Sequence, residues 1–322
     1  MKRRVLGAIY FLGLSCLSCS NYGKTAYALS DFSNHSSEIG FNKILIEEDL
    51  QAYTYFPLEG SSPALLIIEG SYTHNKRPKS ILRLFKPFER IIKEAKCGIV
   101  FMEKQGISPE HFNREKFHRL NTPSQRLSDH QKLLDFLKKN PPNGWNGNFI
   151  ILGGSEGGPI AIKLSRVADP IACITLGGCG DQTFKEHIWH TIQNYRHGKS
   201  IKNKLIAWWY NFPKNYLDFD KKCRLMKNDP SPKKWWFGQT YLYWADSLDQ
   251  EEKTAFLELN CPVLVIAGSK DLEESSTQRL VSQAEEKGKD VIYKRIEGMG
   301  HNVLGPQWKV IDIVLDFLNS LN

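Results

Sequence analysis

The sequence lacks the features of several large functional classes. Its apolar stretch near the N-terminus, Val5 to Leu17, is too short to cross a bilayer as a helix. It contains no G-x-G-x-x-G or G-x-x-x-x-G-K-[ST] pattern for binding phosphate groups, no ligand spacing typical of a metal site, and no internal repeat. These absences argue against a nucleotide-binding loop, a metal centre and a solenoid.

The N-terminus has the pattern of a secretory signal peptide. A basic start, Lys2 to Arg4, precedes the short apolar stretch, and small residues follow it. We assign residues 1–28 to the signal peptide and residues 29–42, which are polar and aperiodic, to a linker. We therefore expect an exported protein: periplasmic, secreted, or a lipid-anchored envelope protein.

Two processing sites compete at the end of this signal. Ala26-Tyr27-Ala28 is an A-x-A cleavage pattern, whereas Cys16 and Cys19 each follow a small residue, as the lipid-bearing cysteine of a bacterial lipoprotein does. The aliphatic residue that usually stands three places before such a cysteine is missing for both. We expect membrane association only through such a lipid or through an uncleaved signal.

Cysteine is scarce in the rest of the chain. Five cysteines remain, an odd number, and no C-x-x-C pair is left among them. A bridge between Cys179 and Cys223 is one pairing that an oxidising compartment would permit, although sequence does not determine connectivity. The other three lie in or beside apolar runs typical of buried positions: Cys97, Cys173 and Cys261.

The composition is that of a globular protein with a basic excess. The chain is 41% hydrophobic and 24% charged, with a formal net charge of +8. Basic residues lie among acidic ones along the chain and no nucleic-acid-binding motif is present, so we expect no nucleic-acid partner. The densest basic cluster, a candidate for the mouth of a site, comprises Arg196, His197, Lys199, Lys202, Lys204, Lys221, Lys222 and Arg224.

Strand and helix signals alternate along most of the chain, which predicts a mostly parallel sheet with helices on its faces. Residues 181–258 interrupt this alternation with helical segments rich in large aromatic side chains. We therefore expect one catalytic domain, residues 43–180 and 259–322, with a helical lid inserted at residues 181–258. The predicted buried strands include residues 64–68, 98–102, 148–152, 171–176, 262–267 and 291–296.

The segment Gly153-Gly154-Ser155-Glu156-Gly157 matches G-x-S-x-G. This pattern is typical of a sharp turn between a strand and a helix, where small residues let backbones pass closely and leave the serine hydroxyl exposed. An apolar strand precedes the match and a helical segment follows it. Ser155 is therefore our candidate nucleophile, and it requires a neighbouring base because a serine hydroxyl is a poor nucleophile at neutral pH.

His301 is the candidate base. Of the nine histidines, it alone follows a late strand on a glycine-rich turn, residues 297–302. With this base, we expect activity to fall as the imidazole protonates below about pH 6–7. His187 and His190 lie three positions apart, but no further metal ligands stand in register with them, so we interpret them as packing or surface residues.

Asp271 is the candidate acid, because it stands just past the strand that follows the insertion. A carboxylate at that point can accept a hydrogen bond from the histidine Nδ1 and stabilise the imidazolium. Asp181, after the preceding strand, is the alternative.

Two backbone N–H groups are candidates for an oxyanion hole. One belongs to Glu156, directly after the nucleophile, and the other to Ser71, in the loop after the strand at residues 64–68. Tyr72 is an alternative to Ser71, through its amide or its phenol.

From about Lys43 onward the chain resembles the α/β-hydrolase superfamily. The turns Gly-Gly-Ser-Glu-Gly-Gly, Ala-Gly-Ser-Lys-Asp and Gly-Met-Gly-His are similar to that superfamily's nucleophile, acid and histidine turns. Glu69-Gly70 stands where many members have His-Gly, and Gln105 where Gly or Arg is more usual. The resemblance implies an α/β fold with a central sheet of about eight strands, a lid after the sixth strand, and no metal or organic cofactor.

These residues predict a serine hydrolase that acts on ester, thioester or amide bonds of a small acyl or short peptidyl substrate through an acyl-enzyme. We favour a carboxylic ester or acyl hydrolase. A serine peptidase of the aminopeptidase type is an alternative, for which Glu156 or an acid of the lid would bind the substrate amine. A non-catalytic binding protein on the same fold is the other alternative.

Overall fold

The computed structural model describes residues 41–47, 50–56, 61–71, 89–109, 111–301 and 307–321. The predicted signal peptide and most of the predicted linker, residues 29–40, therefore lie outside the described residues. Asn42, the last residue of the predicted linker, is the first residue of a strand. Within the described part of the chain, no helix combines the length and apolarity that a bilayer crossing requires.

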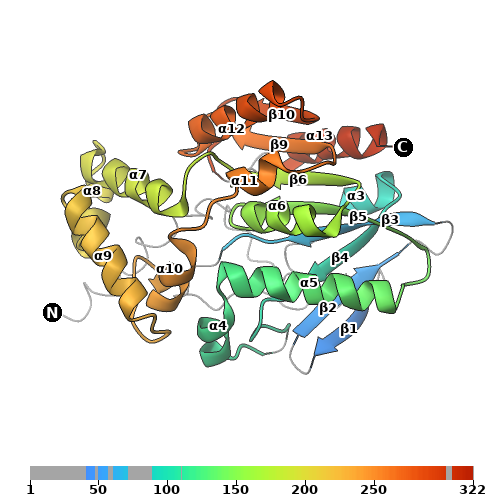
Figure 1. Ribbon diagram of the computed structural model, residues 1–322, viewed down its shortest axis with the longest axis horizontal. Coiled ribbons are helices and arrows are strands. Elements are labelled where there is room, and N and C mark those ends of the chain that lie inside the picture. The colour runs from blue at the N-terminus through green and yellow to red at the C-terminus, as the bar shows by residue number, and fades with distance from the viewer. Residues whose placement is uncertain are drawn as a thin grey trace.

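One eight-stranded sheet forms the centre of the molecule (Figure 1). Its strand order is β1-β2-β4-β3-β5-β6-β9-β10. The pairs β1–β2 and β2–β4 are antiparallel, and all later pairs are parallel. The strands are β1 (Asn42–Glu47), β2 (Leu50–Tyr55), β3 (Ser62–Ile68), β4 (Gly98–Met102), β5 (Trp145–Gly154), β6 (Ala172–Leu176), β9 (Val263–Gly268) and β10 (Val291–Ile296).

Helices cover both faces of this sheet, as the alternation of apolar runs predicts. Strand β3 shows why: Leu65 and Ile67 point into one hydrophobic cluster, and Leu66 and Ile68 into another. Helices α3 (Glu89–Glu94) and α13 (Gln307–Ser320) contribute to the first cluster. The second cluster receives side chains from α5 (Pro123–Lys139), α6 (Gly157–Ala168), α11 (Lys253–Leu257) and α12 (Glu274–Glu286). Helix α4 (Arg114–Leu120) directly precedes α5 in the chain.

A helical insertion follows β6 and projects from one end of the molecule (Figure 1). It has a hydrophobic cluster of its own that runs from Ile188 to Leu248, whereas Ala255 and Phe256 of α11 pack with the main body. Its elements are α7 (Phe184–His197), α8 (Ile201–Trp209), α9 (Tyr216–Asn228), the short pair β7 (Trp235–Trp236) and β8 (Gln239–Thr240), and α10 (Tyr241–Ser247).

The disulfide between Cys179 and Cys223 that the sequence would permit is not formed, and both residues are free thiols. Cys179 packs in the main body, and Cys223 belongs to the cluster of the insertion. Burial raises the pKa of both thiols above the ordinary value, so each behaves as a small apolar side chain.

Candidate active site

Ser155 stands on a tight turn between β5 and α6. Its φ is +52°, a left-handed conformation that is unusual for a residue with a side chain. The amide of Ser155 donates to the carbonyl of Leu176 at 3.0 Å, and its own carbonyl accepts from Gly158 at 2.8 Å, so both sides of the turn are fixed. This geometry lifts the hydroxyl above the carboxyl edge of the sheet.

Two glycines make this turn sterically feasible. A Cβ on Gly153 would collide with the carbonyl of Gly157, and a Cβ on Gly157 would collide with the carbonyl of Ile68. These are the glycines two places before and two places after Ser155. The close backbone approach that the G-x-S-x-G pattern predicts is thus present in the structure.

The three predicted side chains meet at the carboxyl edge of the sheet. His301 Nε2 lies 2.8 Å from Ser155 Oγ, and His301 Nδ1 lies 2.9 Å from Asp271 Oδ2. The Asp271 side chain is only 3% exposed. The loops that carry the acid and the base are joined, because Lys270 N–H donates to the carbonyl of Met299 at 2.7 Å.

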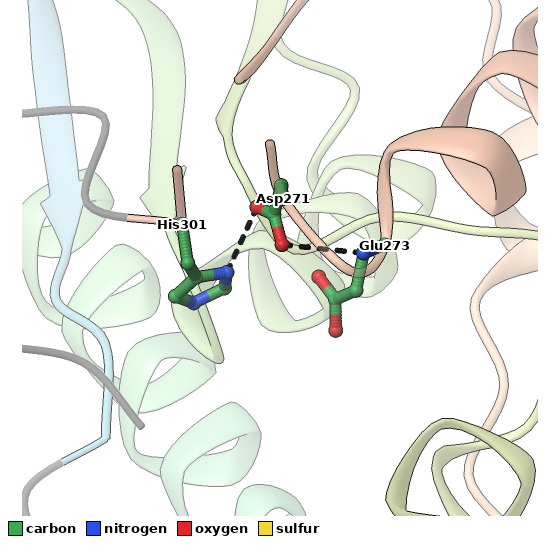
Figure 2. A group of neighbouring side chains, drawn as sticks. All are labelled: Asp271, Glu273 and His301. Atoms are coloured by element: carbon green, nitrogen blue, oxygen red, sulfur yellow. Dashed lines mark hydrogen bonds and ion pairs between the residues drawn. The ribbon is translucent and has the colours of Figure 1, made fainter. Parts of the chain in front are cut away.

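Glu273 extends this group of side chains. Figure 2 shows its carboxylate beside the imidazole of His301, while its amide donates to Asp271 Oδ1 at 3.2 Å. Ligand-type atoms of Asp271, Glu273 and His301 lie within 4.8 Å of one another, a spacing that a metal ion could use. Both ring nitrogens of His301 already have hydrogen-bond partners, however, so a metal would have to displace Ser155 or Asp271.

The acid partner controls the titration of the histidine. Burial lowers the pKa of His301, but the hydrogen bond and charge of Asp271, together with the charge of Glu273, outweigh it and raise that pKa to about 9. For Asp271, burial favours the neutral form, but the hydrogen bond and charge of His301 prevail and lower its pKa below the ordinary value. The pair is therefore built to hold a carboxylate against an imidazolium.

The loop after β3 lies directly against Ser155. A Cβ added to Gly70 would come within 2.9 Å of Ser155 Cβ, so only a glycine fits at this point. Ser71, Ser155, Glu156 and His301 all line one cavity. The backbone N–H of Glu156 stands at the start of α6, where the first amides of a helix have no partner within it.

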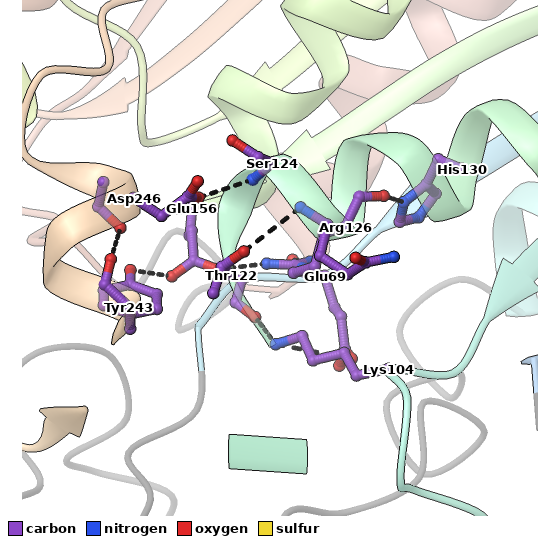
Figure 3. A network of polar contacts seen from close by, with 12 residues as sticks. Glu69, Lys104, Thr122, Ser124, Arg126, His130, Glu156, Tyr243 and Asp246 are labelled. Atoms are coloured by element: carbon purple, nitrogen blue, oxygen red, sulfur yellow. Dashed lines mark hydrogen bonds and ion pairs between the residues drawn. The ribbon is translucent and has the colours of Figure 1, made fainter. Parts of the chain in front are cut away.

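Two buried cations, Lys104 and Arg126, bind the backbone carbonyls of the loop after β3 (Figure 3). Lys104 Nζ donates to the carbonyl of Gly70, and Arg126 Nη2 donates to the carbonyl of Glu69. A trans peptide points its N–H away from its carbonyl, so a carbonyl drawn toward Lys104 turns the amide of Ser71 to the opposite side. Burial and the charge of Arg126 lower the pKa of Lys104 to about 8, although nearby carboxylates oppose the shift.

The same network reaches the insertion. Arg126 Nη1 pairs with Glu156 Oε1, and the hydroxyl of Tyr243 on α10 donates to Glu156 Oε2. Figure 3 shows the three side chains in line between α5 and α10. Both oxygens of Glu156 are therefore engaged, which leaves no free carboxylate oxygen there for a substrate amine.

No protein-family model matches this sequence, and neither does any curated protein. Solved structures do match. The chain aligns with a thermostable carboxyl esterase from Bacillus coagulans at a TM-score of 0.60 and 14% identity, over 88% of this chain and 99% of that one. Est1E from Butyrivibrio proteoclasticus aligns at a TM-score of 0.54 and 15% identity, and a proline iminopeptidase from Mycobacterium smegmatis at a TM-score of 0.57 and 12% identity. Each of these two alignments covers 88% of this chain and 98% of the other chain.

The chain has the α/β-hydrolase fold. The predicted sheet of about eight strands, mostly parallel with helices on both faces, is confirmed. In this α/β-hydrolase fold, Ser155 follows β5, Asp271 follows β9 and His301 follows β10. Carboxyl ends of parallel strands share one edge of a sheet, which is why three distant turns converge.

A cavity of about 130 Å³ lies between this edge and the insertion. The main body contributes Leu127 and Ile160 to its wall, and the insertion contributes Phe184, Tyr243 and Trp244. Its volume is close to that of cavities that hold a benzene ring, roughly 150 Å³. The inner part of a ligand in this cavity would therefore be a short acyl chain or a single ring.

Two carboxyl groups that no sequence motif marks also face the cavity. Glu252 and Glu273 line it. One oxygen of Glu273 lies 3.1 Å from His187 Nδ1, and the other, Oε2, is buried with no hydrogen-bond partner among the described residues. Burial, together with the charge of Glu273, raises the pKa of Glu252 to about 8. Their only sequence signal is position: Glu273 lies two residues after Asp271, and Glu252 near the end of the insertion.

The alternative sequence candidates have other surroundings. Both carboxylate oxygens of Asp181 bind Arg279, and Oδ1 also accepts from Ser276. His187 faces Glu273 in the cavity, whereas His190 is exposed on the same helix. Tyr72 lies outside the described residues. Asp271 is therefore the acid that the structure brings to His301.

Proposed function

We propose that this chain is a serine hydrolase that forms an acyl-enzyme at Ser155. The observation that carries the proposal is the pair of hydrogen bonds from Ser155 Oγ to His301 Nε2 and from His301 Nδ1 to Asp271 Oδ2. In this arrangement His301 takes the hydroxyl proton as Ser155 attacks a carbonyl, and then gives it to the leaving group. His301 would then take a proton from water as the water attacks the acyl-enzyme, and it would return that proton to Ser155 as the acid leaves.

The developing oxyanion would be bound by the backbone N–H groups of Glu156 and Ser71. Support comes from the position of Gly70 against Ser155 and from the two cations that hold its loop. Lys104 and Arg126 act on the oxyanion through the loop, so they are positioning residues. Losing one oxyanion donor typically costs about 10²–10³ in kcat, so the orientation of the Ser71 amide matters for rate.

We favour a carboxylic ester or acyl hydrolase with a small acyl group. The cavity beside Ser155 is largely apolar and of about 130 Å³, which suits a short acyl chain or one ring. The insertion would act as its lid, because Phe184, Tyr243 and Trp244 form one side of the cavity.

A serine peptidase of the aminopeptidase type is the second candidate. The unpartnered oxygen of Glu273 favours it, since a buried carboxylate oxygen in a substrate cavity can bind an ammonium group. Glu156 does not fit that role, because Arg126 and Tyr243 occupy its oxygens.

Covalent labelling tests the central proposal. A fluorophosphonate probe should label the wild-type chain and not Ser155→Ala, and the control Ser320→Ala should label as the wild type does. A panel of an ester, a thioester and an aminoacyl amide would then separate the two candidates. If the peptidase assignment is right, Glu273→Gln should impair the aminoacyl amide much more than the ester when both are measured above the pH midpoint of His301. Equal labelling of Ser155→Ala would overturn the assignment of Ser155 as nucleophile, and a wild-type chain that the probe does not label would favour a binding protein on this fold.

A further inference from the structure

An apolar stripe lies exposed on helix α8 of the insertion. Its members are 76%, 59%, 75% and 48% exposed: Ile201, Leu205, Trp208 and Trp209. Their spacing of four, seven and eight positions places them on one face of the helix. The opposite face, with Ile206 and Ala207, packs into the core of the insertion, so the stripe lies on the face of α8 that is turned away from that core.

A cationic hollow of about 750 Å³ adjoins this stripe and shares Trp208 with it. Arg196, Lys204, Lys214 and Lys222 line the hollow, against a single acid, Asp218. Arg196 and Lys222 donate to neutral oxygens, the carbonyl of Phe212 and the hydroxyl of Tyr241, so these bonds leave both positive charges uncompensated.

Nearly all of the chain's positive excess is concentrated here. Residues 196–227 contain nine Lys or Arg residues and two Asp residues, a net charge of +7, while the whole chain carries +8. One of those two acids, Asp220, is already paired with Lys185 and Arg224. The basic cluster in the sequence is therefore a local feature of the insertion, at the end of the molecule away from the sheet (Figure 1).

We propose that the stripe on α8 and the adjoining hollow form a docking surface for an anionic lipid bilayer. Trp208 and Leu205 would enter the interface between headgroups and acyl chains, and Lys204 and Lys214 would meet lipid phosphates. Exposed tryptophan with flanking lysine is the composition that such an interface binds. The proposal does not depend on the hydrolase chemistry, although the same insertion contributes Phe184 and Tyr243 to the cavity beside Ser155.

Charge and shape favour a bilayer over other occupants. A second copy that met this chain through the same face would set the four basic residues of one hollow against the four of the other, with only one acid on each side, and this repulsion opposes association. A nucleic acid would use the lysines but would have no use for four exposed apolar side chains on one helix face. A bilayer with acidic lipids uses both parts of the surface.

Vesicle binding by the full chain tests the proposal. Co-sedimentation is measured with vesicles of phosphatidylcholine alone and with vesicles in which a third of the lipid is phosphatidylglycerol. Two double variants address the two parts of the surface: Leu205→Ser with Trp208→Ser, and Lys204→Gln with Lys214→Gln. The matched controls are Val167→Ser, at a residue 62% exposed on α6, and Lys138→Gln with Lys139→Gln, at the end of α5.

We expect binding to the acidic vesicles that is much stronger than to phosphatidylcholine and weaker at high salt. Neutralising both lysines should weaken it roughly thirtyfold, since each basic residue near an acidic surface contributes about 1 kcal/mol. The stripe variant should lose at least about tenfold, and the controls should bind as the wild type does.

Three results would overturn the proposal. Binding that is equal for both lipid compositions and for all variants would point to attachment through the N-terminus instead. Binding to DNA at equal strength, with no effect of the stripe variant, would make the surface a polyanion site. Dimers in the absence of vesicles that the stripe variant dissociates would make it a self-interface.

Discussion

The Nε2 atom of His301 lies 2.8 Å from the Oγ atom of Ser155, across 146 positions of sequence. On its other side the imidazole meets Asp271, which is 3% exposed, and Glu273 lies close by. This surrounding of negative charge determines how the proposed base titrates. The structure therefore changes the pH range in which activity is expected.

The rate should rise with pH around a midpoint well above that of an ordinary histidine. His301 acts as a base only when neutral, and its pKa is raised from 6.5 to about 9. A profile of kcat/KM against pH measures this midpoint directly. Glu273→Gln removes one raising charge and should shift the midpoint downward, whereas the exposed control Glu297→Gln should not. A midpoint near 6.5 in the wild type would contradict the geometry of this pair.

Lys104→Met should lower kcat by about ten- to a thousandfold with little change in KM. The substitution removes the donor that holds the carbonyl of Gly70, so the Ser71 amide loses its orientation toward the proposed oxyanion. Steady-state kinetics on an ester substrate separate kcat from KM. Lys132→Met, which breaks a surface pair with Glu47, is the control and should leave both parameters unchanged. If Lys104→Met lowers the free energy of unfolding but leaves kcat unchanged, the role of Lys104 is purely structural.

Tyr243→Phe should destabilise the protein by about 1–3 kcal/mol. The hydroxyl of Tyr243 donates to Glu156 Oε2 in a buried setting, so its removal leaves a carboxylate oxygen short of a donor away from water. Urea denaturation measures the free energy of unfolding. Tyr293→Phe removes a bond to Glu274 in a more exposed place and should cost less than the first variant. Equal costs for the two variants would argue against a tight link between α10 and the turn at Ser155.

Glu252→Gln should gain stability relative to the wild type as the pH rises. The pKa of Glu252 is raised from 4.5 to about 8, so between these values the folded state binds more protons than the unfolded state. Wild-type stability from this group is therefore complete below about pH 4.5 and is lost as the pH rises toward 8. Gln retains an acceptor for the amide of Gly180 and does not titrate. Thermal melts of the wild type and of Glu252→Gln at pH 5 and pH 8 measure the difference in melting temperature between them, with the exposed Glu286→Gln as control. A difference in melting temperature that is the same at both pH values would disprove this prediction.

The sequence by itself determined the fold and the local form of the turn at Ser155. Continuous apolar runs such as Ala64–Ile68 require burial on both faces, and this produces a parallel sheet with helices on either side. The glycines around Ser155 predict the sharp turn, because only residues without a Cβ allow those backbones to meet. The order of nucleophile, acid and histidine along the chain then indicated Asp271 and His301, because the loops that follow successive parallel strands lie at the same edge of the sheet.

Other features of the site were decided only by tertiary structure. Lys104, Arg126 and Tyr243 come from three different parts of the chain, and each takes part through long-range contacts that no local pattern encodes. The pKa of His301 likewise depends on which charges lie nearby after folding, so the sequence predicts a midpoint near pH 6–7 where the structure gives about 9. Local periodicity fixes the elements, whereas buried charge contacts depend on distances between elements, which exist only once the sheet has assembled.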